Sequence, residues 1–421
     1  MPASARRRAR HRRLGGPPVS SAGSRQAHFT TGRNTGRLLG VDVFFVLSGF
    51  LITTILVQEY QTRGTIDLRA FWIRRLLRLV PALLVILLVL LVLGLLVDGR
   101  VLDHGQGIST PPEQNPNSRQ ISMPYWPGIM VVLLPISNFG ILGYQEFRPM
   151  LVAWSLAVED QFYLVWPLVL LFLTIRCRAV KTVALTVSLG VPVFLAWRLF
   201  LIHRGAETGI VPNPALPWIY YRTDGRADQL LTGSALGLAV AVGWVPSTKI
   251  AKRIVAGLAW AGALVILTLF VVAEQNYPWV YSVGFTMTAL ATAVVVLHII
   301  IEPDASMGRA LSWPVLVGIG QLSYGIYLWH WALMTYTPGD SLTQSAAVVV
   351  LTAIGTMLSW RFVEQPALRL KRRFERRADF PPAAMPSGLH QFHPAGPCYR
   401  VETSCRCREL LPWRWDSLRC C

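Results

Sequence analysis

Long apolar stretches follow one another along the chain and are separated by short polar connections. A helix that crosses a bilayer needs about 20 mostly apolar residues, because each residue adds about 1.5 Å toward a hydrocarbon layer of roughly 30 Å. The pattern predicts nine such helices, at residues 38–57, 79–97, 155–175, 182–202, 228–245, 254–273, 278–300, 315–335 and 343–363. We therefore expect an all-α fold, a polytopic bundle of about nine transmembrane helices.

A tenth apolar stretch, residues 125–142, is interrupted by Pro127, Pro135 and Asn138. Proline disrupts the interior of a helix because it lacks a backbone N–H donor. We expect this stretch to form a re-entrant or interfacial segment that does not cross the membrane.

Composition supports an integral membrane protein and argues against a nucleic-acid partner. Of the 421 residues 53% are hydrophobic and 15% are charged, whereas soluble domains carry about 25% charged residues. The net charge of +18 belongs mainly to the ends, since residues 1–37 contribute +9 and residues 366–421 contribute +6. A nucleic-acid-binding domain would instead gather its basic residues on a folded face.

Basic residues in short loops predict which ends of the helices face the cytoplasm. Arginine and lysine place the loops at 58–78, 176–181 and 246–253 inside, together with the C-terminus. Nine crossings then leave residues 1–37, with nine arginines, on the outside. A further helix ahead of Leu38 would remove this conflict.

The two ends differ in composition from the apolar body. Five of the six cysteines lie in the last 24 residues, and their spacing matches no zinc pattern, so we predict no metal site. We divide the chain into a basic tail at 1–37, a membrane domain at 38–370 and a cytoplasmic tail at 371–421, and we expect both tails to be disordered.

Six stretches of the body occur in an order typical of one family of membrane enzymes. They are GVDVFFVLSGFLIT (40–53), FWIRRLLRLVPAL (71–83), WSLAVEDQFYLVWPL (154–168), YRTDGRADQLLTGSALG (221–237), LSYGIYLWHWAL (322–333) and SWRFVEQPALR (359–369). Through them the chain resembles the acyltransferase-3 family of integral membrane O-acyltransferases, which modify sugars of the cell envelope and some macrolides.

The resemblance implies transfer of a short acyl group, acetyl by default, in a bacterial-type plasma membrane. The donor would be an acyl-CoA used as co-substrate, with no permanently bound cofactor. The acceptor would be a hydroxyl of a carbohydrate or glycosylated molecule. Any esterase-like partner domain is expected to be a separate chain.

The resemblance is weakest at the beginning of the chain. Family members begin with a helix that carries an Arg or Lys and, about eleven residues later, a His implied to be essential for transfer. Residues 1–37 are too polar for such a helix, and His11 and His28 follow no helical pattern. A wrong start site or a frameshift is our preferred interpretation, and little or no transfer is then expected; simple disorder of both ends is the alternative.

A polar stripe opens the predicted helix 155–175. Ser155, Glu159, Tyr163 and Trp166 share one face at helical spacing. Ionisable groups within membrane spans are candidates for function, so Glu159 is predicted to face the bundle interior and to act in acid–base chemistry or to orient a partner. The alternative is that Glu159 only complements the positive end of the helix dipole.

A second stripe in the span 315–335 contains Ser323, Tyr327, His330 and Met334. His330 is a candidate base because the pKa of an unperturbed histidine is near neutral, although a buried histidine bonded to a neighbouring helix is an equal alternative. The resemblance implies a supporting role for His330.

Asp42 and Ser48 are the polar candidates of the first predicted span. Asp42 lies near its outer end and is either a catalytic residue or a cap. Ser48 and Gly49 lie about midway, where the glycine favours close helix packing.

Three arginines, Arg74, Arg75 and Arg78, are the candidates for binding the phosphates of an acyl-CoA donor. The alternative is that they only anchor the cytoplasmic end of their helix. Farther along, Arg226 is predicted to join Arg222, Asp224 and Asp228 in an ion-pair network at the outer ends of the helices. There Arg226 is a candidate for contact with the acceptor or for a supporting role.

These depths suggest vectorial transfer, in which the donor binds on the cytoplasmic side and the acyl group leaves near the outer leaflet. Two other functions fit parts of the pattern. A transporter also uses acids within the membrane for proton coupling, and a truncated, inert member of the family would keep the motifs without activity.

Overall fold

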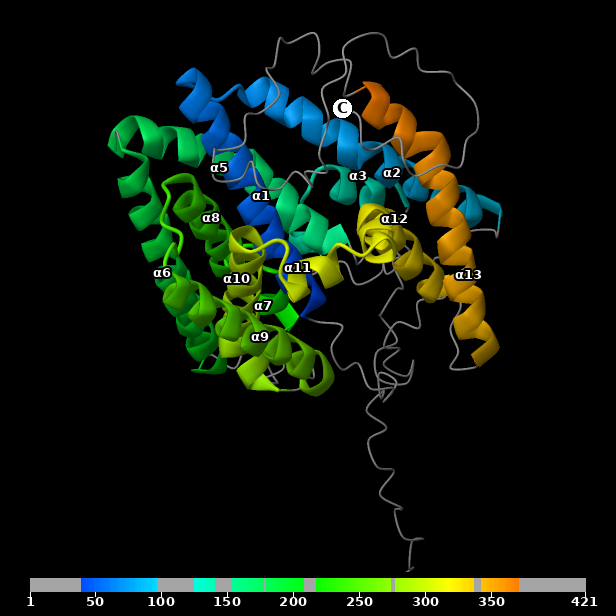
Figure 1. The fold of residues 1–421 in the computed structure, drawn as a ribbon. Helices are drawn as coiled ribbons and strands as arrows, with labels where there is room; N and C mark the ends of the chain where they lie inside the picture. The colour runs from blue at the N-terminus through cyan, green and yellow to red at the C-terminus, as the bar shows by residue number, and fades with distance from the viewer. Residues whose placement is uncertain are drawn as a thin grey trace, which may run out of the picture. The chain divides into compact units, whose positions relative to one another are not determined.

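A computed structural model describes residues 39–96, 125–140, 153–177, 179–207, 217–273, 277–336 and 342–370. Every regular element in these residues is a helix, which confirms the predicted all-α fold (Figure 1). The two tails expected at 1–37 and 371–421 lie outside the described residues. The position of a possible helix ahead of Leu38 lies outside them as well.

Seven of the described helices are long and apolar enough to cross a membrane. Five of them are single α-helices, α1 (Gly40–Arg63), α2 (Leu68–Leu96), α5 (Ala153–Cys177), α6 (Val180–Glu207) and α9 (Lys249–Val272). The other two each include a π-helical turn: η3 (Val280–Gly284) runs into α10 (Phe285–Ile301), and α13 (Leu342–Ser359) runs into η4 (Trp360–Glu364).

The remaining two predicted spans are also helices, α8 (Ala227–Ala241) and α12 (Pro314–Tyr336). Helix α8 has 15 residues, about 22 Å, which is shorter than the hydrocarbon layer. The short helices α7 (Pro217–Tyr221) and α11 (Ser306–Leu311) complete the described elements of this part.

The interrupted stretch at 125–142 does not form a crossing helix in its described part. It consists of α3 (Tyr125–Leu133) and α4 (Ser137–Gly140), separated by a turn at Pro135. The side-chain amide of Gln161 on α5 holds this turn, because its nitrogen donates to the carbonyl oxygen of Pro135 at 2.8 Å and to Oδ1 of Asn138 at 2.9 Å. Each of these helices is too short to cross a bilayer by itself, as expected for an interrupted stretch.

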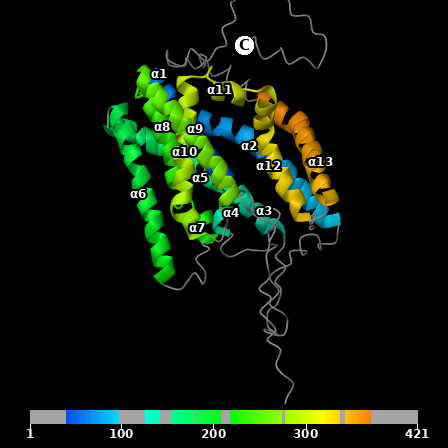
Figure 2. The ribbon, with the colours of Figure 1, turned by 60° about the horizontal axis from the view of Figure 1, so that its bottom comes forward.

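The helices form two groups that meet along α2 and α5. In one group α1 packs against α5, α8 and α10, with α6 and α9 outside them. In the other, α12 packs against α13 and α2, and η4 contacts α2 (Figures 1 and 2). The contact between α2 and α5 joins the groups, and the candidate polar residues gather near this junction.

Glycines let the backbones of α1 and α8 approach each other closely. A Cβ added to Gly49 would lie 2.1 Å from the carbonyl oxygen of Leu230, and one added to Gly233 would lie 2.0 Å from that of Val46. No side chain fits at these distances, so the role expected for Gly49 in close packing is confirmed.

We expect Gly233→Ala to lower the midpoint of thermal unfolding, measured in detergent by size-exclusion fluorescence. The added methyl group meets backbone atoms that cannot move aside, and such overpacking typically costs about 1–3 kcal/mol. Gly257→Ala on α9 is the matched control, because a Cβ there has nothing within 4 Å. Equal midpoints for the two variants would contradict the packing argument.

Candidate functional site

A buried carboxylate, Glu159 on α5, accepts hydrogen bonds from two hydroxyl groups. Ser48 on α1 donates to Glu159 Oε1 at 2.8 Å, and the hydroxyl of Tyr163 lies 3.1 Å from Oε2. The same tyrosine hydroxyl is 3.1 Å from Ser48 Oγ. Since only 3% of Glu159 and 5% of each partner are exposed, these three residues form a compact polar centre in an apolar bundle.

The predicted stripe of helix α5 supplies this centre. Glu159 and Tyr163 are one turn apart, and Trp166, on the same face, donates its indole N–H to Thr53 of α1 at 2.8 Å. The stripe therefore faces the bundle interior, as predicted. This position goes beyond a complement to the helix dipole, because the carboxylate is bonded to another helix.

Helix α2 brings a cation to the other side of Tyr163. The guanidinium carbon of Arg75 lies 4.3 Å from the centroid of the Tyr163 ring, a distance typical of a cation–π contact. Trp72, one turn earlier, donates its indole N–H to the backbone carbonyl of Tyr163 at 3.0 Å. These two contacts dock α2 against α5 and direct Arg75 toward the polar centre.

The other two predicted donor-binding arginines, Arg74 and Arg78, have different surroundings. Arg74 lies 3.7 Å from Glu59, which also accepts the backbone N–H of Asp67 at 3.1 Å and so ties the α1–α2 turn together. Arg78 is exposed. Of the three predicted donor-binding arginines, the structure brings only Arg75 against the polar centre.

Arg75 and Glu159 lie at more similar depths within the bundle than the sequence predicts. Arg75 is the eighth residue of α2 and lies about 10 Å along it. Tyr163 lies one turn farther into α5 than Glu159, so it spans the remaining distance between the two charged groups. The predicted inner and outer parts of the site thus meet at one tyrosine.

A hydrogen bond connects the two predicted stripes. Ser155, one turn before Glu159, lies 2.7 Å from the hydroxyl of Tyr327 on α12. His330 follows Tyr327 by three residues, on the same face of α12, and is half-buried. The second group of helices therefore contributes Tyr327 directly, with His330 one turn away along α12.

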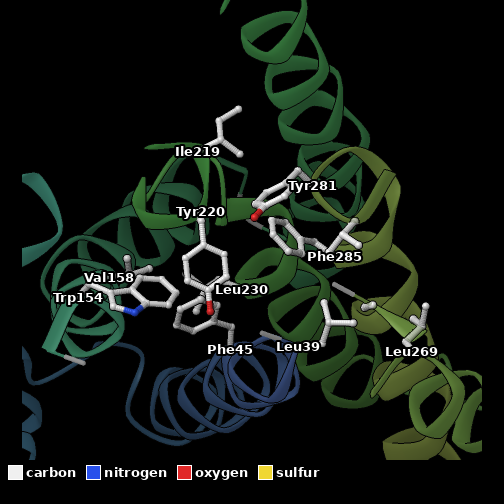
Figure 3. Packing of buried hydrophobic residues seen from close by; sticks show 12 residues of the cluster. Leu39, Phe45, Trp154, Val158, Ile219, Tyr220, Leu230, Leu269, Tyr281 and Phe285 are labelled. Atoms are coloured by element: carbon white, nitrogen blue, oxygen red, sulfur yellow. The ribbon is translucent and has the colours of Figure 1, made fainter. Parts of the chain in front are cut away.

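Asp42 and Arg226 form a separate, fully buried ion pair between α1 and the beginning of α8. The guanidinium of Arg226 also donates from Nε to the carbonyl oxygen of Tyr220 at 2.9 Å and lies 3.7 Å from the ring centroid of Phe285. Figure 3 shows the ring of Tyr220 between those of Trp154 and Phe285. The guanidinium carbon of Arg226 lies 4.4 Å from the centroid of the Tyr220 ring and 5.5 Å from that of Trp154. The position of Asp42 indicates a structural partner of Arg226 and places both residues outside the Glu159 centre.

The predicted outer network of Arg222, Asp224, Arg226 and Asp228 is wrong as a single network. Arg222 pairs with Asp224 at 2.7 Å, whereas Asp228 pairs with Arg198 of α6 at 2.6 Å. The chain turns through Gly225 between these residues, so their side chains point to different helices. Partial burial alone would raise the pKa of Asp224, but the hydrogen bonds from Arg222 and Trp197 outweigh burial and hold the pKa below its usual value.

Arg198 is the buried residue that the sequence interpretation missed. It donates to Asp228, to Thr286 and to the carbonyl oxygens of Gly225 and Ser282, the last at 3.1 Å. The signal was present, since Arg198 is a lone cation inside an apolar predicted span, 182–202, and such residues pair with neighbours inside the bundle.

The chemistry available at the Glu159 centre is proton transfer and anion stabilisation. A carboxylate can accept a proton, two hydroxyls and a guanidinium lie beside it, and the site excludes bulk water, which strengthens each electrostatic contact. Within the described residues, no group of three or more His, Cys, Asp or Glu side chains is placed to hold a metal ion.

Two Arg–Asp pairs of this region allow a test of the structural role of Asp42. Asp42→Asn leaves the cation of Arg226 buried without its partner, a loss that typically costs about 3–5 kcal/mol. Asp224→Asn breaks a pair whose side chains are 29–34% exposed, and such pairs contribute about 0–1 kcal/mol. We therefore expect a large fall in the unfolding midpoint for the first variant and little change for the second.

If Asp42→Asn instead unfolds like the unchanged protein and only an enzymatic activity is lost, Asp42 belongs to the catalytic machinery as the sequence first suggested.

Comparison with known proteins gives a consistent result across most of the chain. The sequence profile of the acyltransferase-3 family, an acyltransferase domain, matches residues 14–361. A putative O-acetyltransferase of Staphylococcus aureus (strain COL) is 32% identical over 354 residues, which cover 79% of this chain and 53% of that protein. The peptidoglycan O-acetyltransferase OatA of Listeria monocytogenes is 31% identical over 347 residues, covering 79% of this chain and 51% of that protein.

The chain thus spans about half the length of the curated relatives it matches. No solved structure matches it.

Proposed function

Because this chain belongs to the acyltransferase-3 family, we propose that it is a membrane enzyme that transfers a short acyl group, acetyl by default, to a hydroxyl of a carbohydrate or glycosylated acceptor. The donor is an acyl-CoA bound from the cytoplasm. The names of the relatives, O-acetyltransferases and a peptidoglycan O-acetyltransferase, support both the acetyl group and the carbohydrate. Seven apolar helices support the location in a bilayer.

The observation that carries this proposal is the buried Glu159 with its two hydroxyl partners. Burying a carboxylate among apolar helices is costly unless it is hydrogen-bonded, and the bundle meets that cost with side chains of α1 and α5. In the proposed reaction Glu159 takes the proton of a reacting hydroxyl. His330, on the turn of α12 after the Tyr327 that bonds to Ser155, is a supporting residue in this proposal.

The arginines of α2 are proposed to bind the donor. A guanidinium lying over the face of an aromatic ring keeps its N–H donors for other partners, and Arg75 contacts the ring of Tyr163 in this way. Arg78 follows on the next turn and is exposed. Arg75 and Arg78, one turn apart on α2, would hold phosphate groups of the donor, with the C-terminus of the chain on the same, cytoplasmic side.

The test is transfer of radiolabelled acetyl groups by the full chain in proteoliposomes. Acetyl-CoA is supplied from outside the vesicles and peptidoglycan fragments are the acceptor, and ester-linked label in the glycan is the expected product. Uptake of the glycan without any transfer of label would favour a transporter. Absence of both, with protein that elutes as a folded species, would contradict the proposal and indicate an inert chain.

We expect Glu159→Gln to lower the rate of acetyl transfer by a factor of about 10²–10⁴, the usual contribution of an acid–base residue. The amide keeps the size of the side chain but cannot take up the proton. Glu364→Gln is the matched control, because Glu364 is also buried and also accepts a hydrogen bond from a serine, Ser359, at 3.3 Å. Equal rates for the two variants would remove Glu159 from the reaction.

A further inference from the structure

Ser48 is the one hydroxyl of the first helix that donates directly to the buried carboxylate of α5 in the described residues. A serine becomes a nucleophile when a base lies within hydrogen-bond reach and a third group orients that base. Here the base is Glu159, at 2.8 Å, and the orienting group is Tyr163, whose hydroxyl lies 3.1 Å from the second carboxylate oxygen. The three side chains therefore have the arrangement of a nucleophile, a base and an orienting residue.

Groups that can stabilise negative charge in the transition state also lie beside Ser48. Attack on a thioester carbonyl produces an oxyanion, which needs a hydrogen-bond donor or a cation nearby. The hydroxyl of Tyr163 lies 3.1 Å from Ser48 Oγ, and the guanidinium of Arg75 lies over the same ring.

At the depth of Ser48, a covalent intermediate would separate the binding of the two substrates in time. Ser48 is the ninth residue of the 24-residue helix α1, about 12 Å from one end and about 22 Å from the other. A charged acyl-CoA on one side and a polar acceptor on the other cannot both occupy the middle of the membrane easily. An acyl group held on Ser48 allows the first substrate to leave before the second arrives, and burial protects the ester from water.

On the basis of the proposed function, we infer that Ser48 carries the acyl group as an oxygen ester between two half-reactions. In the first, Ser48 Oγ bonds to the acyl carbon, its proton passes to Glu159, the carbon–sulfur bond breaks, and the departing thiolate takes the proton from Glu159. In the second, the acceptor hydroxyl attacks the ester and gives its proton to Glu159. The bond to Ser48 then breaks and Ser48 recovers a proton from Glu159.

The experiment incubates the purified full chain with radiolabelled acetyl-CoA and no acceptor. We expect at most one acetyl group per chain, resistant to neutral hydroxylamine as an oxygen ester is, and mass spectrometry should place it on the peptide that contains Ser48. Addition of the acceptor should discharge it. Ser48→Ala should lose the label, and Ser48→Cys should restore it as a thioester that neutral hydroxylamine removes.

Thr53→Ala is the control for a purely structural effect. It also removes a buried hydroxyl of α1 that bonds to α5, since Thr53 accepts from Trp166 at 2.8 Å, and it should keep the label. Label on another residue, or a Ser48→Ala variant that transfers at the original rate, would overturn the inference.

The inference and the proposed function fail in different ways. Acetyl transfer to the glycan without any label on Ser48 would leave the proposed function standing and refute the intermediate. Absence of both transfer and label in folded protein would refute the proposed function, and the intermediate with it.

Discussion

The organisation of this bundle depends on how it satisfies polar side chains that have no access to water. A buried charge is tolerated only with a partner, and in three cases described here a partner comes from another segment. Glu159 of α5 is bonded to α1, Asp42 of α1 to Arg226, and Arg198 of α6 to Asp228 of α8. These contacts determine which helices lie together and in which register.

Helix α1 is the element that connects the polar sites. It carries Asp42 and Ser48, six residues and about 9 Å apart, each bonded to a different neighbour. Its position is in turn defined by the close approach to α8. Because Gly49 and Gly233 have no side chains, the backbones of the two helices come into contact there. A change in the packing of α1 and α8 would therefore move both polar sites together, although neither glycine touches a charged group.

Helical periodicity was sufficient to predict the fold class, the interrupted segment and the two polar stripes, because each is a property of one stretch of sequence. The stripe containing Glu159 and Tyr163 does face the interior, and Tyr327 of the second stripe reaches Ser155 of the first. Pairing between helices was beyond such reasoning. Ser48 and Glu159 are 111 residues apart, and periodicity identifies a face of a helix without identifying the helix opposite.

The same limit explains the errors in the charged residues. Four residues close in sequence, Arg222 to Asp228, were expected to pair locally, yet Arg226 and Asp228 find partners on α1 and α6. Similarly, Arg74 and Arg75 are adjacent but diverge by about 100° around α2, so one closes the α1–α2 turn and the other reaches Tyr163.

Tyr163 lies between the cation of Arg75 and the carboxylate of Glu159. Its ring lies against the guanidinium of Arg75, and its hydroxyl lies against Glu159. A direct ion pair would occupy the carboxylate oxygens that accept a proton in the proposed reaction. With a neutral phenol between them, the arginine can favour negative charge nearby while the carboxylate stays available to Ser48. In the proposed reaction, the ring of Tyr163 between Arg75 and Glu159 would thus let a cation and a base serve the same small site.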